Sequence, residues 1–211
     1  TLPYVKEMGE VLAAERGGGP QDHINMGMEL ITPLVFGKEE AAVFWDMYQR
    51  GLKVGLMSMP SIGGTAPVTL AGTLALNLAE IWLCSALRRA FFGIKGLFYL
   101  CSAAPLDMRT GLWRFGRPET GLMYLAMGQL ARHRKAEYYA NCLVCDAHRP
   151  SAEVGYEKAL NFIPAVLAGT TGTGSAGLLS LDEYNSPIQL ILDNEFVGAV
   201  KRLAGGITVG D

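Results

Sequence analysis

Hydrophobic residues along the chain alternate between the spacing of amphipathic helices and the continuous runs of buried strands. The helical pattern and its start and stop signals predict helices over residues 4–16, 38–50, 67–89, 118–132, 151–167 and 187–203. Short apolar runs between them predict strands over residues 26–36, 53–59, 96–102, 137–144 and 175–179, although Pro33 argues against a full-length first strand. Short apolar strands, each followed by a helix, indicate a parallel sheet that is buried on both faces.

Several residues mark where these helices begin and which of their faces are apolar. Pro67 lies near the first turn of the helix at 67–89, and the last helix has Ser186 as its N-cap and Pro187 at its first position. Apolar stripes at helical spacing identify the faces that we expect to be buried, namely Val43, Phe44 and Met47 in the helix at 38–50, and Leu70, Leu74, Leu78 and Ile81 in the helix at 67–89.

The number of strand–helix units limits the architecture. About five units fit in this chain, whereas a closed eightfold barrel usually takes roughly 250 residues. The sequence therefore predicts either the later part of such a barrel or an open sheet, with no internal repeat and no clear domain linker. In both architectures the functional loops follow the C-terminal ends of the strands.

Composition narrows the class of protein. Hydrophobic residues make up 50% of the 211 residues and charged residues 18%, which excludes a disordered segment. A formal net charge of −2 and a pI near 5.9 argue against general nucleic-acid binding, which requires a cationic surplus. The four cysteines, at positions 84, 101, 142 and 145, lack the spacing of a secreted disulfide framework. We therefore expect a reducing, cytoplasmic environment.

The chain shows no pattern that predicts a membrane span or a signal peptide. Its longest charge-free stretch, residues 54–79, is interrupted by Pro60, Gly63, Gly64 and Pro67, which would leave backbone groups unsatisfied in lipid. The first residues have neither a Met start nor a basic segment followed by an apolar one. We expect the sequence to be the interior of a longer protein.

Two short motifs have a plainer interpretation than the one they first suggest. Residues 172–177 match the G-x-G-x-x-G pattern of dinucleotide-binding folds, but they precede an apolar run instead of joining a strand to a helix, so a flexible turn is favoured. Cys142 and Cys145 form a C-x-x-C pair without a second pair, and His148 could serve as a third zinc ligand. The favoured interpretation is that both cysteines are buried, inert thiols, and a catalytic zinc site is the alternative.

Three loops carry residues that a purely structural role explains poorly. Residues 60–66 are rich in Gly and Pro and precede a helix N-terminus, which favours anionic groups. Residues 107–113 place Asp107, Arg109 and Trp113 between a strand and a helix, and residues 145–151 concentrate ionisable groups in the next such loop. In a parallel barrel these loops would face the same mouth.

Four segments together resemble the trimethylamine methyltransferase superfamily. They are residues 59–72, 107–111, 146–159 and 192–202, in the order that the family has them, and they extend over nearly the whole chain. The resemblance implies a TIM (β/α)8 barrel, of which residues 1–211 would be the C-terminal part of one methyltransferase domain. It also implies transfer of a methyl group from an amine to the cobalt of a separate corrinoid protein, or to free cobalamin.

The founding enzymes of the superfamily use pyrrolysine, which would fall in or near residues 141–151, whereas this chain has only standard residues there. This difference moves the expected donor from trimethylamine to a quaternary amine, as in the glycine betaine branch. A quaternary ammonium already has a neutral amine as its leaving group, so no general acid is needed. Attack by anionic Co(I) neutralises charge, which a dry pocket favours.

A quaternary nitrogen has no N–H, so aromatic faces are its natural partners, at roughly 0.5–2 kcal/mol each. Aromatic candidates are Tyr156, Trp113, Phe115 and Tyr99, and donors for a substrate carboxylate are His148, Arg149 and Arg109. We rank His148 and Tyr156 first, then Arg109 and Trp113, as substrate-binding residues. The plain alternatives are that Tyr156 packs in the core and that Arg109 pairs with Asp107.

Three functions stay open from the sequence. The first is the corrinoid-dependent methyltransferase, with trimethylamine or another methylamine as the alternative donor. The second is a non-catalytic amine-binding barrel, and the third is a zinc-dependent methyltransferase that uses Cys142, Cys145 and His148. The expected partners are a methylated amine and a corrinoid protein, with no nucleic acid and no membrane. We also expect a homo-oligomer.

Overall fold

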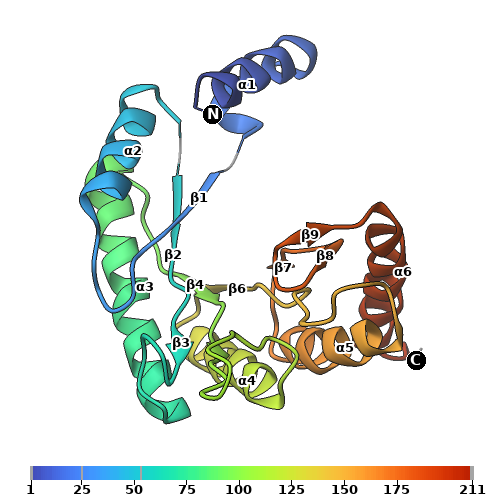
Figure 1. The fold of residues 1–211 in the computed structure, drawn as a ribbon. Helices are drawn as coiled ribbons and strands as arrows, with labels where there is room; N and C mark the ends of the chain where they lie inside the picture. The colour runs from blue at the N-terminus through green and yellow to red at the C-terminus, as the bar shows by residue number, and fades with distance from the viewer. Residues whose placement is uncertain (1, 25, 53, 210–211) are drawn as a thin grey trace. The chain divides into compact units, whose positions relative to one another are not determined.

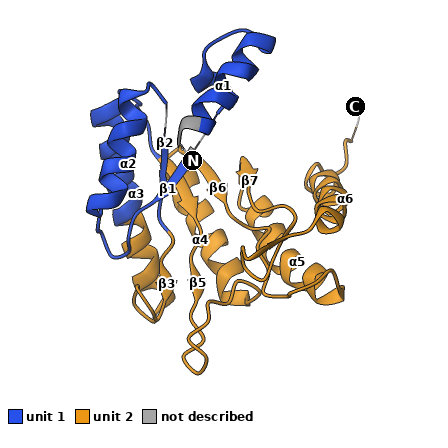
Figure 2. Cartoon of the chain, turned by 45° about the horizontal axis from the view of Figure 1, so that its top comes forward, with its two compact units in different colours: residues 1–58, 79–97 blue, residues 59–78, 98–211 orange. Residues whose placement is uncertain are grey.

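A computed structural model describes residues 2–24, 26–52 and 54–209, and it shows helices alternating with short strands (Figure 1). The chain divides into two compact units (Figure 2), one made of Thr1–Ser58 and Ala79–Leu97, the other of Met59–Leu78 and Phe98–Asp211.

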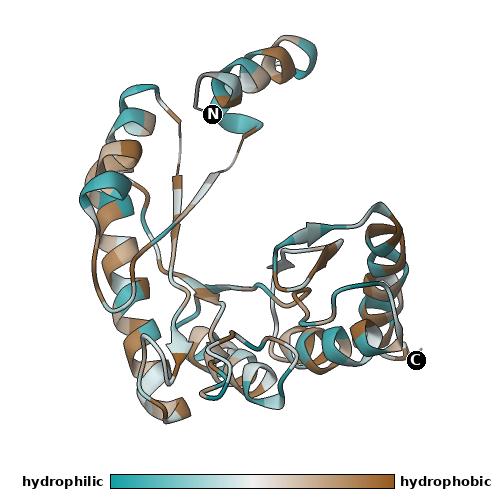
Figure 3. Cartoon of the chain, viewed as in Figure 1, coloured by the Kyte–Doolittle hydropathy of each residue, from teal (hydrophilic) through white to brown (hydrophobic). Residues whose placement is uncertain are grey.

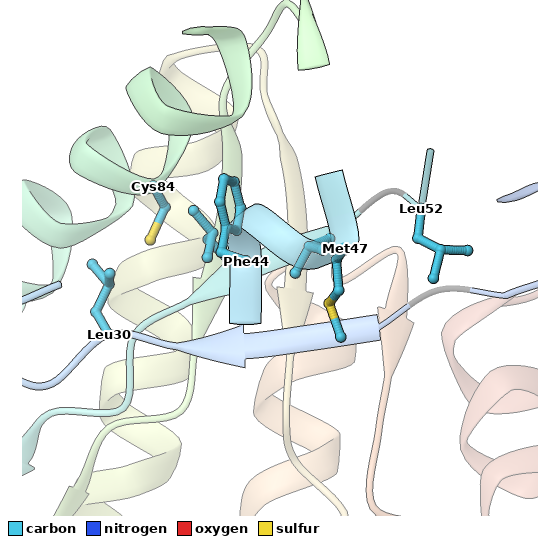
Figure 4. Close-up of a cluster of buried hydrophobic side chains, with 7 residues drawn as sticks. Leu30, Phe44, Met47, Leu52 and Cys84 are labelled. Carbon is cyan, nitrogen blue, oxygen red and sulfur yellow. The ribbon is translucent and has the colours of Figure 1, made fainter. Parts of the chain in front are cut away.

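Unit 1 is built around two parallel strands and two long helices. Its elements are α1 (Leu2–Arg16), the 3-10 helix η1 (Pro20–Asp22), β1 (Met26–Glu29), α2 (Lys38–Gln49), β2 (Val54–Met57) and the later part of α3 (Leu70–Phe92). β1 and β2 pair in parallel, with Met28 opposite Leu56. The core contains Leu30, Phe44, Met47, Leu52 and Cys84 (Figure 4). The predicted apolar face of α2 is therefore confirmed for Phe44 and Met47, whereas Val43 is exposed.

Unit 2 contains the remaining elements and a three-stranded parallel sheet. Its elements are β3 (Ser61–Ile62), β4 (Phe98–Cys101), β5 (Ala104–Pro105), α4 (Pro118–His133), β6 (Glu137–Ala140), α5 (Ala152–Leu167), β7 (Gly172–Thr173), β8 (Leu178–Leu179), β9 (Tyr184–Asn185) and α6 (Pro187–Ala204). The parallel sheet has the order β4-β6-β7, and β3 pairs in parallel with β5. The hairpin β8-β9 is antiparallel.

The two faces of the β4-β6-β7 sheet differ because successive side chains point to opposite sides of a strand. Tyr138 on one face is buried, and its hydroxyl donates to the carbonyl of Tyr124 in α4 at 2.8 Å. Tyr139 on the other face is half-buried, and its ring lies 6.1 Å from that of Phe98. Helix α4 therefore covers one face, and the opposite face carries two aromatic rings.

The sequence-based expectation of an α/β fold with parallel strands and six helices is confirmed. The described strands form several small sheets and no closed barrel. The last predicted strand was misplaced: the strand that joins the parallel sheet is β7 at Gly172–Thr173, and residues 178–179 pair antiparallel with 184–185. The apolar run at Leu178 misled the prediction because β7 itself contains only Gly and Thr.

The apolar stripe expected on α3 is confirmed at Ile81, which is 3% exposed, and only in part at its leucines. Leu70, Leu74 and Leu78 are half-buried, whereas polar residues of the same helix are fully buried, among them Glu80. Both Glu80 carboxylate oxygens accept hydrogen bonds: the backbone N–H of Leu34 donates at 2.8 Å, the Thr32 hydroxyl at 3.1 Å, and the Ser58 hydroxyl also donates. A buried carboxylate with several donors is tolerated in a core.

Helix α3 also corrects the expectation that no segment has the character of a membrane span. Apolar residues recur along its length (Figure 3), and it is the one helix in the described residues that is long and apolar enough to cross a membrane. This finding rests on length and composition alone. The buried Glu80 and the packing of Cys84 in the unit 1 core are typical of a core helix.

Candidate functional site

Several strand-end segments of unit 2 meet in one apolar cluster. Ala104, Phe115 and Val144 form its buried centre, and Met59, Trp113 and Leu181 pack against it. The backbone also joins the first loop to the residue before the second, because the N–H of Leu106 donates to the carbonyl of Ile62 at 3.0 Å. The structure therefore brings together residues that lie within or directly beside the three loops singled out in the sequence analysis.

Trp113 is the best-fixed of the predicted site residues. Its indole N–H donates to the carbonyl of Ala104 at 2.9 Å, and its ring lies 5.4 Å from that of Phe115 in an edge-to-face arrangement. The side chain is half-buried, so part of the ring is accessible. Phe115 is 2% exposed and belongs to the core, which leaves it no free face for a ligand.

Arg109 lies at the exposed tip of the 107–113 loop. Its backbone N–H donates to Asp107 at 2.9 Å, and this bond is the main cause of the lowered pKa of the Asp107 carboxyl. The guanidinium that pairs with Asp107 belongs to Arg114, at 3.9 Å. The alternative that Arg109 forms that ion pair is therefore wrong, because the turn directs its backbone toward the carboxylate.

His148 and Tyr156 are both on the surface. His148 is exposed in the loop before α5, and Tyr156 is 65% exposed on that helix. The interpretation that Tyr156 packs in the core is wrong, since the buried face of α5 presents Val154, Glu157 and Lys158 instead. Tyr99, the other aromatic candidate, is 1% exposed and lies inside unit 2. The described contacts do not join His148 to Tyr156, Arg109 or Trp113.

A group of polar side chains that the sequence analysis missed lies at the C-terminal end of the parallel sheet. Asn141, directly after β6, donates through its amide to the hydroxyl of Ser102 after β4 at 3.3 Å. The hydroxyl of Ser175, after β7, donates to the Asn141 carbonyl oxygen. We call Ser102, Asn141 and Ser175 the strand-end cluster. The ladder register Leu100 opposite Tyr139 places Ser102 beside Asn141, on the face that carries the Tyr139 ring.

One signal in the sequence could have revealed this cluster. Tyr139 and Asn141 stand two residues apart within one predicted strand, and Leu100 and Ser102 do so at the end of another, so period-two alternation places each pair on one face. Ser175 could not have been found in this way because β7 was predicted at the wrong residues. The cluster is polar but uncharged, and its aromatic neighbours supply ring faces.

A pocket of about 290 Å³ adjoins the same strand end. Its lining combines the segment after β7 with one face of α6: Leu143, Thr173, Gly174, Ser175, Ala176, Leu190, Asp193, Asn194 and Val197. The glycine-rich segment at 172–177 thus begins in the parallel strand β7, which corrects the sequence-based placement. The Asp193 carboxylate in the lining is already engaged, because it accepts from Lys158 at 2.6 Å and from the Gly177 N–H at 2.7 Å.

The cysteine pair does not have the properties of a zinc site. Cys142 lies with its sulfur 3.0 Å from the Thr173 hydroxyl, whereas the Cys145 thiol donates to the carbonyl of Leu178 at 3.6 Å. Burial raises the pKa of each thiol to about 12, so both stay protonated near neutral pH. The described residues contain no group of three His, Cys, Asp or Glu side chains that could hold a metal ion. The prediction of buried thiols is confirmed.

A family model matches nearly the whole chain. The family model for trimethylamine methyltransferase (MTTB) matches residues 5–211. The chain belongs to this family. The resemblance drawn from the four sequence segments is therefore confirmed.

Individual relatives in the trimethylamine methyltransferase family carry two different activity names. The chain is 32% identical over 180 residues to trimethylamine methyltransferase MttB of Methanosarcina thermophila, covering 85% of this chain and 37% of the relative. It is 33% identical over 178 residues to MttB2 of Methanosarcina mazei, covering 84% and 36%. It is 28% identical over 179 residues to a glycine betaine methyltransferase of Desulfitobacterium hafniense, covering 84% and 37%. The chain thus spans just over a third of the length of these relatives.

Proposed function

We propose that this chain is the later part of a TIM-barrel methyltransferase that moves a methyl group from a quaternary amine to the Co(I) of a corrinoid protein. The observation that carries the proposal is the sheet face opposite α4, where the rings of Phe98 and Tyr139 lie 6.1 Å apart and Tyr139 comes two residues before Asn141 of the strand-end cluster. Family membership over residues 5–211 supports methyl transfer as the class of reaction.

Aromatic rings with neutral polar neighbours suit a permanently cationic methyl donor. Ring faces attract a quaternary ammonium electrostatically, by about 0.5–2 kcal/mol each depending on desolvation. The Asn141 carbonyl oxygen adds a negative dipole end that does not require an N–H on the ligand. In this site the chain would hold the donor in place and exclude water, which strengthens the charge neutralisation of the transfer step.

The cobalt belongs to the methyl acceptor, which we treat as a second substrate, either a corrinoid protein or free cobalamin. Cys142 and Cys145 do not fit as ligands for it because their thiols are buried and protonated. The acceptor would supply the nucleophile, and the residues of this chain would orient the donor. A cytoplasmic location and a homo-oligomer remain part of the proposal.

Trimethylamine is the second candidate donor. Relatives named for trimethylamine are 27–33% identical to this chain, and the relative named for glycine betaine is 28% identical. The reason for preferring a quaternary amine is that this chain contains only standard residues. The pyrrolysine of the founding enzymes therefore has no counterpart in it.

A methyl-transfer assay with a panel of donors tests the proposal. The chain and the longer protein expected to contain it are each incubated with Co(I) cobalamin and with glycine betaine, proline betaine, carnitine, choline or trimethylamine. Methylcobalamin formation from a quaternary amine alone supports the proposal. Formation from trimethylamine alone favours the second candidate. Donor binding in calorimetry without any transfer would favour a non-catalytic amine-binding barrel and overturn the proposal.

A further inference from the structure

The half-buried Trp113 depends on a set of buried polar side chains that come from another loop and from α5. The residue two positions later, Phe115, has both of its backbone polar groups bound by side chains. Its N–H donates to the carboxylate of Asp146 at 2.7 Å, and its carbonyl accepts from the amide of Asn161 at 2.8 Å. Asp146 and Asn161 are 9% and 0% exposed, so neither contact competes with bulk water.

A third side chain fixes Asp146 in turn. The carboxylate of Glu157 accepts the backbone N–H groups of Asp146 at 2.7 Å and of Ala147 at 3.1 Å. It also lies against Gly116, where an added Cβ would come within 2.3 Å of the Glu157 carboxyl carbon. The chain therefore requires Gly at 116 for the carboxylate to reach the 146–147 backbone. We call Asp146, Glu157 and Asn161 the loop clamp.

We propose that the loop clamp positions Trp113 as a further aromatic contact for the methylated amine, by holding Phe115 and Gly116 against the loop that follows β6. Asp146, Glu157 and Asn161 are positioning residues, because they act through the backbone and not on the substrate. The clamp residues fix Phe115, and Phe115 in turn holds the Trp113 ring through an edge-to-face contact. The hydrogen bond from the Trp113 indole to Ala104 fixes the ring on its other side. Ring orientation matters because a cation is attracted by the face of an aromatic ring. The functional part of this inference rests on the proposed methyl transfer.

The fluorescence of Trp113 tests the inference without any assay of activity. Trp45 and Trp82 are half-exposed, at 47% and 50%, so both can be replaced by Phe to leave Trp113 as the only tryptophan, which is excited selectively over tyrosine. Asp146→Ala removes the acceptor of the Phe115 N–H. We expect its Trp113 emission to shift to longer wavelength and its acrylamide quenching to rise about twofold, since a loosened ring gains contact with water.

Three further variants separate a loss of Trp113 positioning from a general loss of stability. Asp146→Asn keeps an oxygen acceptor for the Phe115 N–H, so we expect emission close to that of the parent. Tyr138→Phe removes a different buried hydrogen bond of the same unit, and it should lower stability without moving the Trp113 emission. Gly116→Ala displaces the Glu157 carboxylate from the opposite side, and we expect it to reproduce the Asp146→Ala spectrum even where that variant folds poorly.

Steady-state kinetics of the clamp variant Asp146→Ala test whether the loop clamp affects the reaction. In the full-length enzyme Asp146→Ala should raise KM for the donor by roughly fivefold with kcat little changed, as expected when one cation–π contact is weakened. Unchanged emission in both Asp146→Ala and Gly116→Ala, or an equal shift in Tyr138→Phe, would overturn the positioning role. A shifted emission in an enzyme that transfers no methyl group would keep the clamp and refute the proposed function instead.

Discussion

The Lys158 ammonium and the Asp193 carboxylate lie 2.6 Å apart, and both side chains are almost completely buried. The same carboxylate accepts the N–H of Gly177 at 2.7 Å and the amide of Gln189 at 2.7 Å. This ion pair therefore ties α5 to α6 and to the segment after β7. Two of the segments that carry the family resemblance, at 146–159 and 192–202, meet in this contact.

Breaking one side of this pair should cost much more than replacing both. We expect Lys158→Met alone, or Asp193→Leu alone, to lower the free energy of unfolding by about 3–5 kcal/mol, because each leaves an uncompensated buried charge. The double variant Lys158→Met/Asp193→Leu should recover part of the loss. Urea denaturation of the four proteins measures the coupling, and additive losses would show that the ion pair is not coupled.

Glu80 should be a main determinant of stability in unit 1. Glu80→Ala leaves the Leu34 N–H and the hydroxyls of Thr32 and Ser58 without their acceptor, so we expect a loss of roughly 2–4 kcal/mol. Amide hydrogen exchange at Leu34 should accelerate in the variant. The exposed Glu10, which pairs with Lys6 at 3.5 Å on α1, provides the matched control Glu10→Ala. A similar effect of both variants would contradict this role.

Cys142 and Cys145 have raised thiol pKa values. The reactivity of these thiols and the stability of the folded protein should therefore change with pH in the alkaline range. Because burial raises the folded pKa from 9.0 to about 12, the thiols stay protonated while those of the unfolded chain ionise. Their contribution to stability is complete below pH 9 and is lost as pH rises toward 12. Iodoacetamide at pH 8.5 should label them slowly in the native protein and quickly in urea. Equal labelling rates would show that these thiols are accessible.

Aromatic variants on the sheet face should affect the affinity for a quaternary amine. Tyr139→Leu removes a ring face and should weaken donor binding several-fold, whereas Tyr139→Phe keeps the face and should bind nearly as well as the parent. The same pair of substitutions at Tyr156, which is 65% exposed, tests the sequence-based candidate. Calorimetry with tetramethylammonium and glycine betaine measures both. Equal losses for Leu and Phe would argue against cation–π recognition at that position.

His148 remains the leading sequence-based candidate for binding a substrate carboxylate. Because its side chain is exposed, His148→Ala should leave the thermal unfolding temperature within about 1–2 °C of the parent. Its affinity for glycine betaine should fall, while its affinity for tetramethylammonium, which has no carboxylate, should not change. Unchanged affinity for both ligands would remove His148 from the site.

Local signals in the sequence were enough for the helices and for the class of fold. Ser186 accepts the Gln189 N–H at 3.2 Å and Pro187 begins α6, as the capping pattern predicted. Phe44 and Met47 are buried, as their spacing predicted. β7 was missed because Gly172 and Thr173 carry no apolar signal, and only the ladder with β6 makes them a strand.

The family segments also identified the right protein family without identifying what their residues do. Asp146, Glu157, Lys158 and Asp193 look ionisable and reactive in the sequence, yet all four are buried in contacts that connect loops and helices. These charged groups stabilise the folded structure, since each contacts a hydrogen-bond donor or an ion-pair partner. A sequence does not distinguish these two uses of a carboxylate, because the backbone N–H and lysine partners lie 10 to 35 residues away along the chain.

By itself, therefore, the sequence determined the helical segments, the α/β class and the family, because capping, periodicity and motif order are local properties of the chain. The tertiary structure alone decided which side chains share a face. It placed Asn141 beside Ser102 and Ser175, buried the motif carboxylates, and left His148 and Tyr156 on the surface. The physical reason is that strand register and helix packing, which bring distant residues together, depend on contacts that no short stretch of sequence contains.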